Sequence, residues 1–127
     1  MKKLILMVVA LMGITVVSAQ NVMDVAKEAN AALEGKNYAK AAELLEKVIA
    51  DGSLEEDDAI LEQVNSANKN LPIAYFYTGR LAAAAATKAT DAKVKDAKYA
   101  EAIAALDKAV AIAKNLIEVS LRNMQND

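Results

Sequence analysis

The sequence predicts an all-α fold, in which antiparallel helical hairpins stack as a short solenoid and end in a long C-terminal helix. The main observation is a thirteen-residue phrase that occurs twice without a gap, as YAKAAELLEKVIA at 38–50 and as YAEAIAALDKAVA at 99–111. A repeated helical phrase usually marks a repeated supersecondary unit, and stacked units present a binding surface rather than a catalytic pocket. Ala makes up 26 of the 108 residues after position 19, and β-branched alternation is missing there, which favours helices throughout.

The first nineteen residues resemble a cleaved signal peptide. Lys2 and Lys3 give a positive start, the apolar stretch 4–17 follows, and small residues precede Gln20. The stretch is shorter than the about 20 residues that a membrane span needs, and an uncleaved anchor helix is the alternative. The chain has no Cys, which excludes both a lipid-modified cysteine and a disulfide framework. We expect a periplasmic or secreted protein that begins at Gln20 and has no membrane anchor after cleavage.

Charge limits the partners of the remaining segment, 20–127, which has the length of one domain. It contains thirteen basic and seventeen acidic residues, a net charge of −4. Nucleic acid and anionic membranes are bound through basic patches, so this mild acidity argues against both as partners.

The first expected hairpin covers residues 22–52. One helix over 22–34 carries an apolar stripe, and a tight turn leads to a second helix over 38–50. The residues that predict the helix ends are Asn21, Gly35, Asn37, Asp51 and Gly52.

The middle of the chain predicts an intervening helix over 54–69 and a further helix from 72 to about 86. The segment 53–56 (SLEE) has the pattern of a capping box, and Leu54 belongs to the expected buried side. Pro72 suits the first position of the next helix, although one long helix kinked at Pro72 is the alternative. The polar stretch 87–96 is expected to be a loose connection or a frayed helical extension.

From residue 97 on, the chain has no Gly or Pro and predicts one helix of about 28 residues. Apolar residues recur there in steps of three and four, at Leu106, Val110, Ala113, Ile117, Leu121 and Met124. The extension 112–125 lies beyond the second copy of the phrase. We expect it either to fold along its neighbours as a cap or to pair with a second chain.

These units resemble the tetratricopeptide repeat, a helix-turn-helix unit of about 34 residues. The resemblance covers 22–52 and 72–111, about two-thirds of the segment after the signal peptide. The matching positions are Ala29, Ala32, Tyr38, Ala41, Leu45 and Val48 in the first unit, and Tyr75, Thr78, Gly79, Ala83, Tyr99, Ala102, Leu106 and Ala109 in the second. The small residues Ala41, Gly79 and Ala102 would let helix axes approach closely.

The chain departs from the family pattern in three ways. About ten extra residues separate the helices of the second unit, the helix over 54–69 lies between the units, and the terminal Pro of the motif is missing from both copies. A plain helical bundle with incidental self-similarity is therefore the alternative.

The resemblance implies a concave groove that the first helix of each unit lines. On this basis Phe76 faces the groove, and Ile73 and Arg80 share its face through their three- and four-residue spacing. An exposed aromatic residue beside an Arg is typical of interface anchors. Packing of Phe76 on the preceding helix is the alternative, since aromatic side chains are usually buried. We expect the partner-binding residues to be Ile73, Phe76 and Arg80.

The composition leaves little room for catalysis. Without His or Cys, the common nucleophile–base pairs and soft-metal sites are excluded. The acidic run 55–58 is better explained by a helix start than by a metal site, since no calcium-loop spacing follows it. We therefore expect no cofactor, no metal and no enzymatic activity. The sequence predicts a non-catalytic module that binds a protein or peptide, with a structural homo-oligomer assembled through the C-terminal helix, such as a homodimer, as the alternative.

Overall fold

The computed structural model describes residues 20–126. These residues form four helices without a strand, which confirms the expected all-α class. None of the described helices is both long and apolar enough to span a membrane. The predicted signal peptide, residues 1–19, lies outside the described residues.

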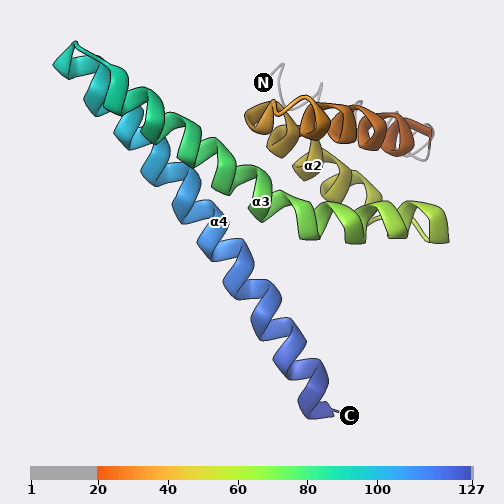
Figure 1. The fold of residues 1–127 in the computed structure, drawn as a ribbon. Helices are drawn as coiled ribbons and strands as arrows, with labels where there is room; N and C mark the ends of the chain where they lie inside the picture. Colours follow the sequence, from red (N-terminus) through yellow and green to blue (C-terminus); the bar gives the residue numbers. More distant parts are fainter. Residues whose placement is uncertain (1–19, 127) are drawn as a thin grey trace, which may run out of the picture.

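The helices follow one another as two hairpins. The first joins a helix over residues 20–34 to α2 (Tyr38–Gly52), and the second joins α3 (Asp58–Lys88) to α4 (Ala92–Asn126). In Figure 1 the first hairpin lies beside the first half of α3, and α4 runs back along the second half of α3. α3 is in contact with both α2 and α4, so it joins the two hairpins into one body.

The turn of the first hairpin depends on Lys36 rather than on the neighbouring Gly35. Lys36 has a φ of 62°, and no glycine in the described chain has a positive φ. The amide of Lys36 donates to the carbonyl of Leu33 at 3.1 Å, and that of Asn37 donates to the carbonyl of Ala32 at 2.8 Å. This pair of bonds is the Schellman pattern that closes many helices. The expected helix end is confirmed, but its left-handed residue is one position later than the glycine suggests.

α2 ends at Gly52, and this residue is packed in the core. A Cβ atom there would lie 2.5 Å from Cγ2 of Val64 and 3.3 Å from Cγ2 of Ile60. Ser53 is the C-cap of α2, and its hydroxyl donates to the carbonyl of Ile49 at 2.5 Å. The predicted capping box at Ser53 is therefore wrong, since Ser53 closes one helix instead of opening the next.

Asp57 opens α3 in place of Ser53. Its carboxylate accepts from the amides of Ala59 at 2.8 Å and Ile60 at 3.3 Å, and Asp58 adds a second acid in the first turn. Both acids stabilise the positive end of the helix dipole. Leu54, which we expected in the core, is 75% exposed because it lies in the turn before the helix. The expected start of this helix is about one turn too early.

Pro72 lies inside α3, so the two helices expected over 54–69 and 72–86 are one helix. The structure therefore has the single long helix that was the alternative to two separate helices. Proline removes one N–H donor and crowds the preceding turn, and α3 bends in its middle (Figure 1). The bend gives the two halves of α3 different directions, one beside the first hairpin and one beside α4.

The segment 87–96 is mostly helical, which agrees with the second of the two expectations, a helical extension. α3 continues to Lys88, and α4 begins at Ala92. Between them, the Asp91 carboxylate accepts from the amide of Lys93 at 2.8 Å and caps α4. The connection between the two long helices is therefore a short turn.

The second copy of the repeated phrase meets α3 at small residues, as predicted. At Gly79, a Cβ atom would lie 2.6 Å from Cγ of Leu106 and 3.1 Å from the carbonyl oxygen of Ala102. Ala102 is buried, and so is Ala41, its counterpart in the first copy of the phrase. The close helix approach expected at Gly79 and Ala102 is confirmed, and Ala41 is buried.

One core links the two hairpins. Eight of its sixteen buried residues are alanines, which bring helices together but bury little apolar area each. The larger buried side chains are Val22, Val25, Leu45, Val48, Ile60, Val64, Leu71 and Tyr75. The predicted apolar stripe of the first helix is thus confirmed.

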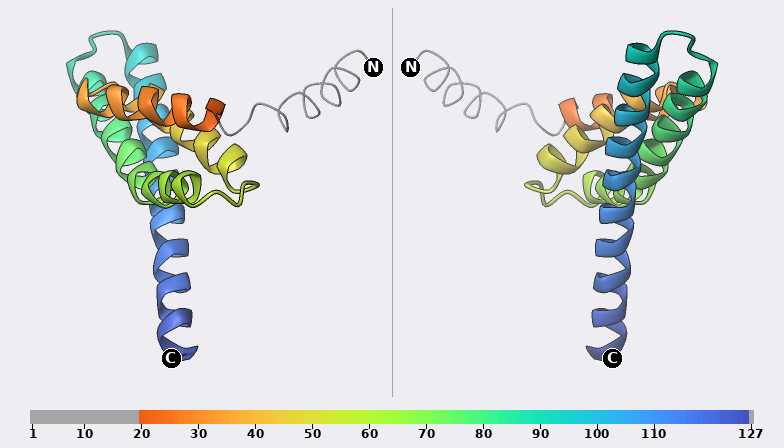
Figure 2. Two further views of the ribbon diagram at one scale, coloured as in Figure 1. Left: turned by 90° about the vertical axis from the view of Figure 1, so that its right-hand side faces the viewer. Right: turned by 90° about the vertical axis from the view of Figure 1, so that its left-hand side faces the viewer.

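α4 continues past its contact with α3 as a projecting helix, which Figures 1 and 2 show. We call residues 114–126 the arm. Its side chains up to residue 125 are exposed, except for the half-buried Leu116. The arm covers no other helix in the described chain, so the expectation that it caps the stack is wrong. Pairing with a second chain stays a prediction.

Candidate functional site

A groove of about 600 Å³ lies between α2, α3 and α4, and we call it the larger groove. α3 lies between two walls, one from the start of α2 with the turn before it, and the other from the first half of α4. The lining residues are Lys36, Asn37, Tyr38, Ala39, Ala42, Tyr75, Thr78, Leu81, Ala82, Ala85, Lys98, Glu101, Ala104, Ala105 and Lys108.

Small side chains keep the larger groove open. Ala82 and Ala85 belong to the alanine run of α3, and both line the groove, whereas Ala86 is fully buried. Leu81 adds a larger exposed apolar side chain at the same surface. The groove therefore offers apolar contact area, which is typical of sites that hold a ligand by burial.

Tyr75 is the buried polar side chain of the larger groove. Its hydroxyl donates to Oε1 of Glu46 at 2.5 Å, and Nζ of Lys108 lies 5.2 Å from its ring centroid. Burial, together with the hydrogen bond and the negative charge of Glu46, raises the pKa of the Tyr75 hydroxyl well above its usual range. Tyr75 therefore remains a neutral donor at neutral pH and joins α2 to α3.

Three lysines stand around the larger groove. Lys36 lies in the turn before α2, and Lys98 and Lys108 lie on α4. Lys98 forms an ion pair with Glu101 at 3.2 Å, and Lys108 faces the Tyr75 ring. The rim thus has more ammonium groups than carboxylates, although the whole chain has a net charge of −2. Such a local excess of positive charge attracts anionic groups.

The predicted partner-binding residues Ile73, Phe76 and Arg80 lie together on α3, but none of them lines the larger groove. Ile73 is 48% exposed and Phe76 is 45% exposed. The Arg80 guanidinium carbon lies 5.8 Å from the Phe76 ring centroid, within reach of a cation–π interaction. The three side chains form an exposed surface, and their role in binding stays a prediction.

A row of aromatic rings connects this surface to the larger groove. The Tyr77 ring stacks on Tyr38, with centroids 4.8 Å apart and planes inclined by 22°. It also meets Phe76 edge-on at 5.5 Å, and Arg80 lies 5.8 Å from its centroid. Tyr38 itself lines the larger groove. Tyr38 and Tyr77 belong to different hairpins, so local spacing could not predict their contact.

A second, apolar groove of about 260 Å³ lies between α3 and α4, and we call it the smaller groove. Its lining residues are Pro72, Ile73, Phe76, Ala109, Val110 and Ala113. Two of the three predicted binding residues therefore lie beside α4, near the bend of α3.

The contacts of Tyr75 with Glu46 and Lys108 were not predicted from the sequence. Glu46 and Tyr75 are 29 positions apart and on different helices, and helical periodicity places Lys108 on the solvent side of α4. Lys108 is indeed exposed, but its ammonium group faces a buried ring. One clue was available: a tyrosine on a core-facing stripe needs a partner for its hydroxyl.

The described residues contain no group of three or more acidic side chains that could hold a metal ion. Within the acidic run, Asp57 and Asp58 serve the start of α3. In comparisons with known proteins, no family model, no curated protein and no solved structure matches this chain. The likeness to the tetratricopeptide repeat thus stays a prediction from the sequence.

Proposed function

We propose that this chain is a non-catalytic interaction module of tetratricopeptide-like architecture, which binds a protein or peptide segment in the larger groove. The observation that carries the proposal is that one groove combines an apolar floor, formed by Leu81, Ala82 and Ala85, with a rim that is rich in lysine. The architecture is supported by two successive helical hairpins with small residues where helices meet, at Ala41, Gly79 and Ala102.

The chemistry of the groove favours a segment that has apolar side chains next to carboxylates. Leu81, Ala82 and Ala85 offer apolar contact, and Lys36 and Lys108 can meet carboxylates by charge-assisted hydrogen bonds. Lys98 is already paired with a carboxylate and contributes less.

We further propose that the module acts outside the cytoplasm, in the periplasm or as a secreted protein. This proposal depends on the positive start, the short apolar stretch and the small residues before Gln20. Mass spectrometry of exported material should give a chain that starts at Gln20. A mass that retains residues 1–19 would contradict the proposal.

Selection of a peptide-display library on the purified protein tests the binding proposal. We expect enrichment of peptides with apolar residues beside Asp or Glu, because these match the floor and the rim. The variant K36E/K108E reverses two rim charges at exposed positions and should lose this preference, while its helix content stays unchanged by circular dichroism. Equal enrichment of acidic and basic peptides, or identical selections on both proteins, would contradict the proposed site.

A further inference from the structure

An exposed apolar stripe runs along α4. Its members Ile103, Val110, Ile117 and Met124 follow at intervals of seven and are 60%, 66%, 59% and 70% exposed. A seven-residue repeat of apolar residues on one helix face is the pattern that pairs helices in a coiled coil. The stripe is therefore the kind of helix face that another helix covers.

No other helix of the described chain covers this stripe. The arm continues alone past α3 (Figure 2), and Ile117 and Met124, which belong to it, are exposed. The stripe also borders the smaller groove, which Val110 lines together with Ile73. The exposed surface is thus continuous from the body of the protein to the tip of the arm.

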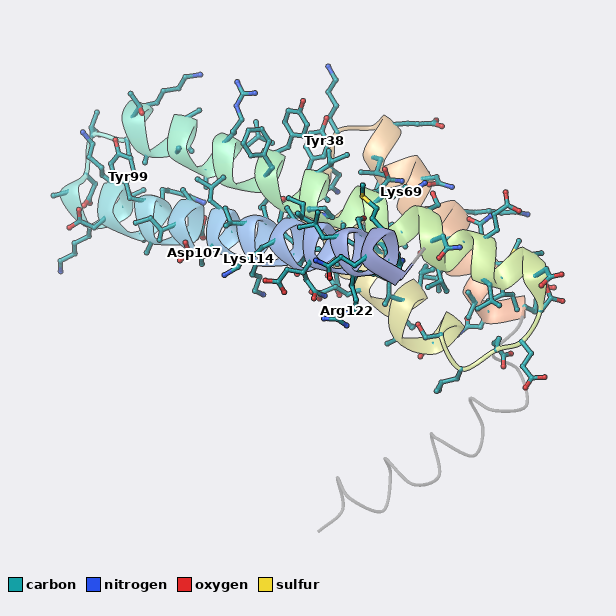
Figure 3. All side chains as sticks on the ribbon, turned by 90° about the horizontal axis from the view of Figure 1, so that it is seen from below. Tyr38, Lys69, Tyr99, Asp107, Lys114 and Arg122 are labelled. Atoms are coloured by element: carbon teal, nitrogen blue, oxygen red, sulfur yellow. The ribbon has the colours of Figure 1, made fainter. Side chains whose placement is uncertain are left out.

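Two opposite charges flank the stripe on one side. Asp107 and Lys114 are both exposed, and Figure 3 shows both on the edge of α4 away from α3. Neither has an ion-pair partner within 4 Å in the described chain. In a parallel pair of helices, each residue lies level with its own copy and the two charges do not meet. In an antiparallel pair, the same flanks of the two helices meet, so Asp107 of each copy can face Lys114 of the other.

We propose that two copies of this chain pair antiparallel through the α4 stripe. The register that joins Asp107 to Lys114 also forms apolar layers between the two helices. In this register, Tyr99 of one copy lies opposite Met124 of the other. Leu106 lies opposite Ile117 in the same way, and Val110 lies opposite Ala113. Ile103 lies opposite the small Ser120 in the same register.

This pairing accounts for the length of α4. The arm of each copy lies along the first half of α4 of the other copy, so Val110, Ile117 and Met124, which are exposed in one chain, gain an apolar neighbour. Self-complementary charge identifies a second copy, rather than an unrelated helix, as the occupant. The larger groove lies on the other side of α4 and stays open.

Sedimentation equilibrium of the intact protein tests the pairing. We expect a dimer, and we expect D107K and K114D each to weaken it by about tenfold, because each replaces two attractions with two repulsions. The double variant D107K/K114D restores the opposite charges and should recover most of the affinity. A monomeric wild-type protein, or charge variants that associate as strongly as wild type, would overturn the proposal.

Cysteine cross-linking tests the orientation, because the natural chain has no Cys. A mixture of I103C and S120C should form an intermolecular disulfide, whereas neither variant alone should cross-link with itself. In the antiparallel register, each position is separated from its own copy by about 25 Å along the axis, at 1.5 Å per residue. Self-cross-linking of both single variants would instead indicate a parallel pair and overturn the proposal. K36E/K108E should leave the dimer intact, which separates this test from that of the larger groove.

Discussion

Lys36 shows how a single backbone angle can depart from the residue that the sequence suggests for it. The Schellman turn after the first helix needs a left-handed residue, and glycine adopts this conformation without a Cβ clash. The chain has Gly35 one position earlier, where φ is not positive, and leaves Lys36 at 62°. The turn is therefore held in a conformation that costs free energy.

Lys36→Gly should raise the free energy of unfolding by about 0.5–1 kcal/mol, because relief of the left-handed strain exceeds the entropy that glycine adds to the unfolded chain. Urea denaturation measures the change. Lys40→Gly is the matched control, because Lys40 is exposed inside α2. This substitution should lower the free energy of unfolding by about 1 kcal/mol. If both variants lose stability alike, the strain at Lys36 is not real.

Tyr75 should make stability depend on alkaline pH. Its pKa is raised in the folded state by burial and by Glu46, while an unfolded tyrosine loses its proton near pH ~10. Above that pH the unfolded state binds fewer protons than the folded state, so the free energy of unfolding falls as pH rises. The fall from this residue is up to about 1.4 kcal/mol per pH unit.

Urea denaturation between pH 9 and 11 checks this dependence, with the wild-type protein compared with two variants. Tyr75→Phe should lose less stability over this range than wild type, and Tyr99→Phe, at an exposed position, should behave like wild type. Equal losses in all three proteins would mean that the Tyr75 hydroxyl keeps an ordinary pKa in the folded chain.

Single elements of the fold were predictable where the sequence pattern is local and repeated. The apolar stripe of the first helix and the small residues of the repeated phrase were placed correctly, because helical periodicity decides which side is buried. The start of α3 was not, because both Ser53 and Asp57 are good helix caps. Gly52 packs against Val64 of another helix and Ser53 is the C-cap of α2, and local spacing could not show this arrangement.

The bend of α3, the partner of the apolar stripe on α4 and the larger groove were harder to predict. Pro72 suits the first turn of a helix and is also tolerated at a bend, and only packing decides between them. An apolar stripe on α4 indicates that something covers it, but not whether the cover belongs to the same chain. The larger groove could not be predicted, since its residues come from three elements and its rim lysines follow no common spacing.

Ala41→Leu and Ala102→Leu should each lower the free energy of unfolding by about 1–3 kcal/mol, because both positions face a neighbouring helix without spare volume. Ala111→Leu is the matched control on an exposed face of α4 and should change stability by less than about 0.5 kcal/mol. Thermal and urea unfolding give both values. Similar losses at all three positions would remove the assignment of the repeated phrase to helix crossings.

At the scale of the whole molecule, the arm links the fold to assembly. Removal of residues 116–127 should change the melting temperature of dilute protein little, because the arm has few neighbours in its own chain. The melting temperature of the full chain should rise with protein concentration, as expected for a dimer, and that of the truncated chain should not. Differential scanning calorimetry over a hundredfold range of concentration measures this difference. A truncated chain that keeps the dependence would exclude the arm from the interface.

The central claim is that a protein segment binds in the larger groove, and titration calorimetry tests it most directly. The probe is the acidic apolar peptide that display selection enriches most, titrated into wild type, A82W and F76A. Ala82→Trp fills the groove and should weaken binding at least about tenfold, whereas Phe76→Ala, at a residue that does not line the groove, should leave affinity within about twofold. The reverse pattern, with binding lost in F76A and kept in A82W, would contradict the claim and place the ligand on the surface of Ile73, Phe76 and Arg80.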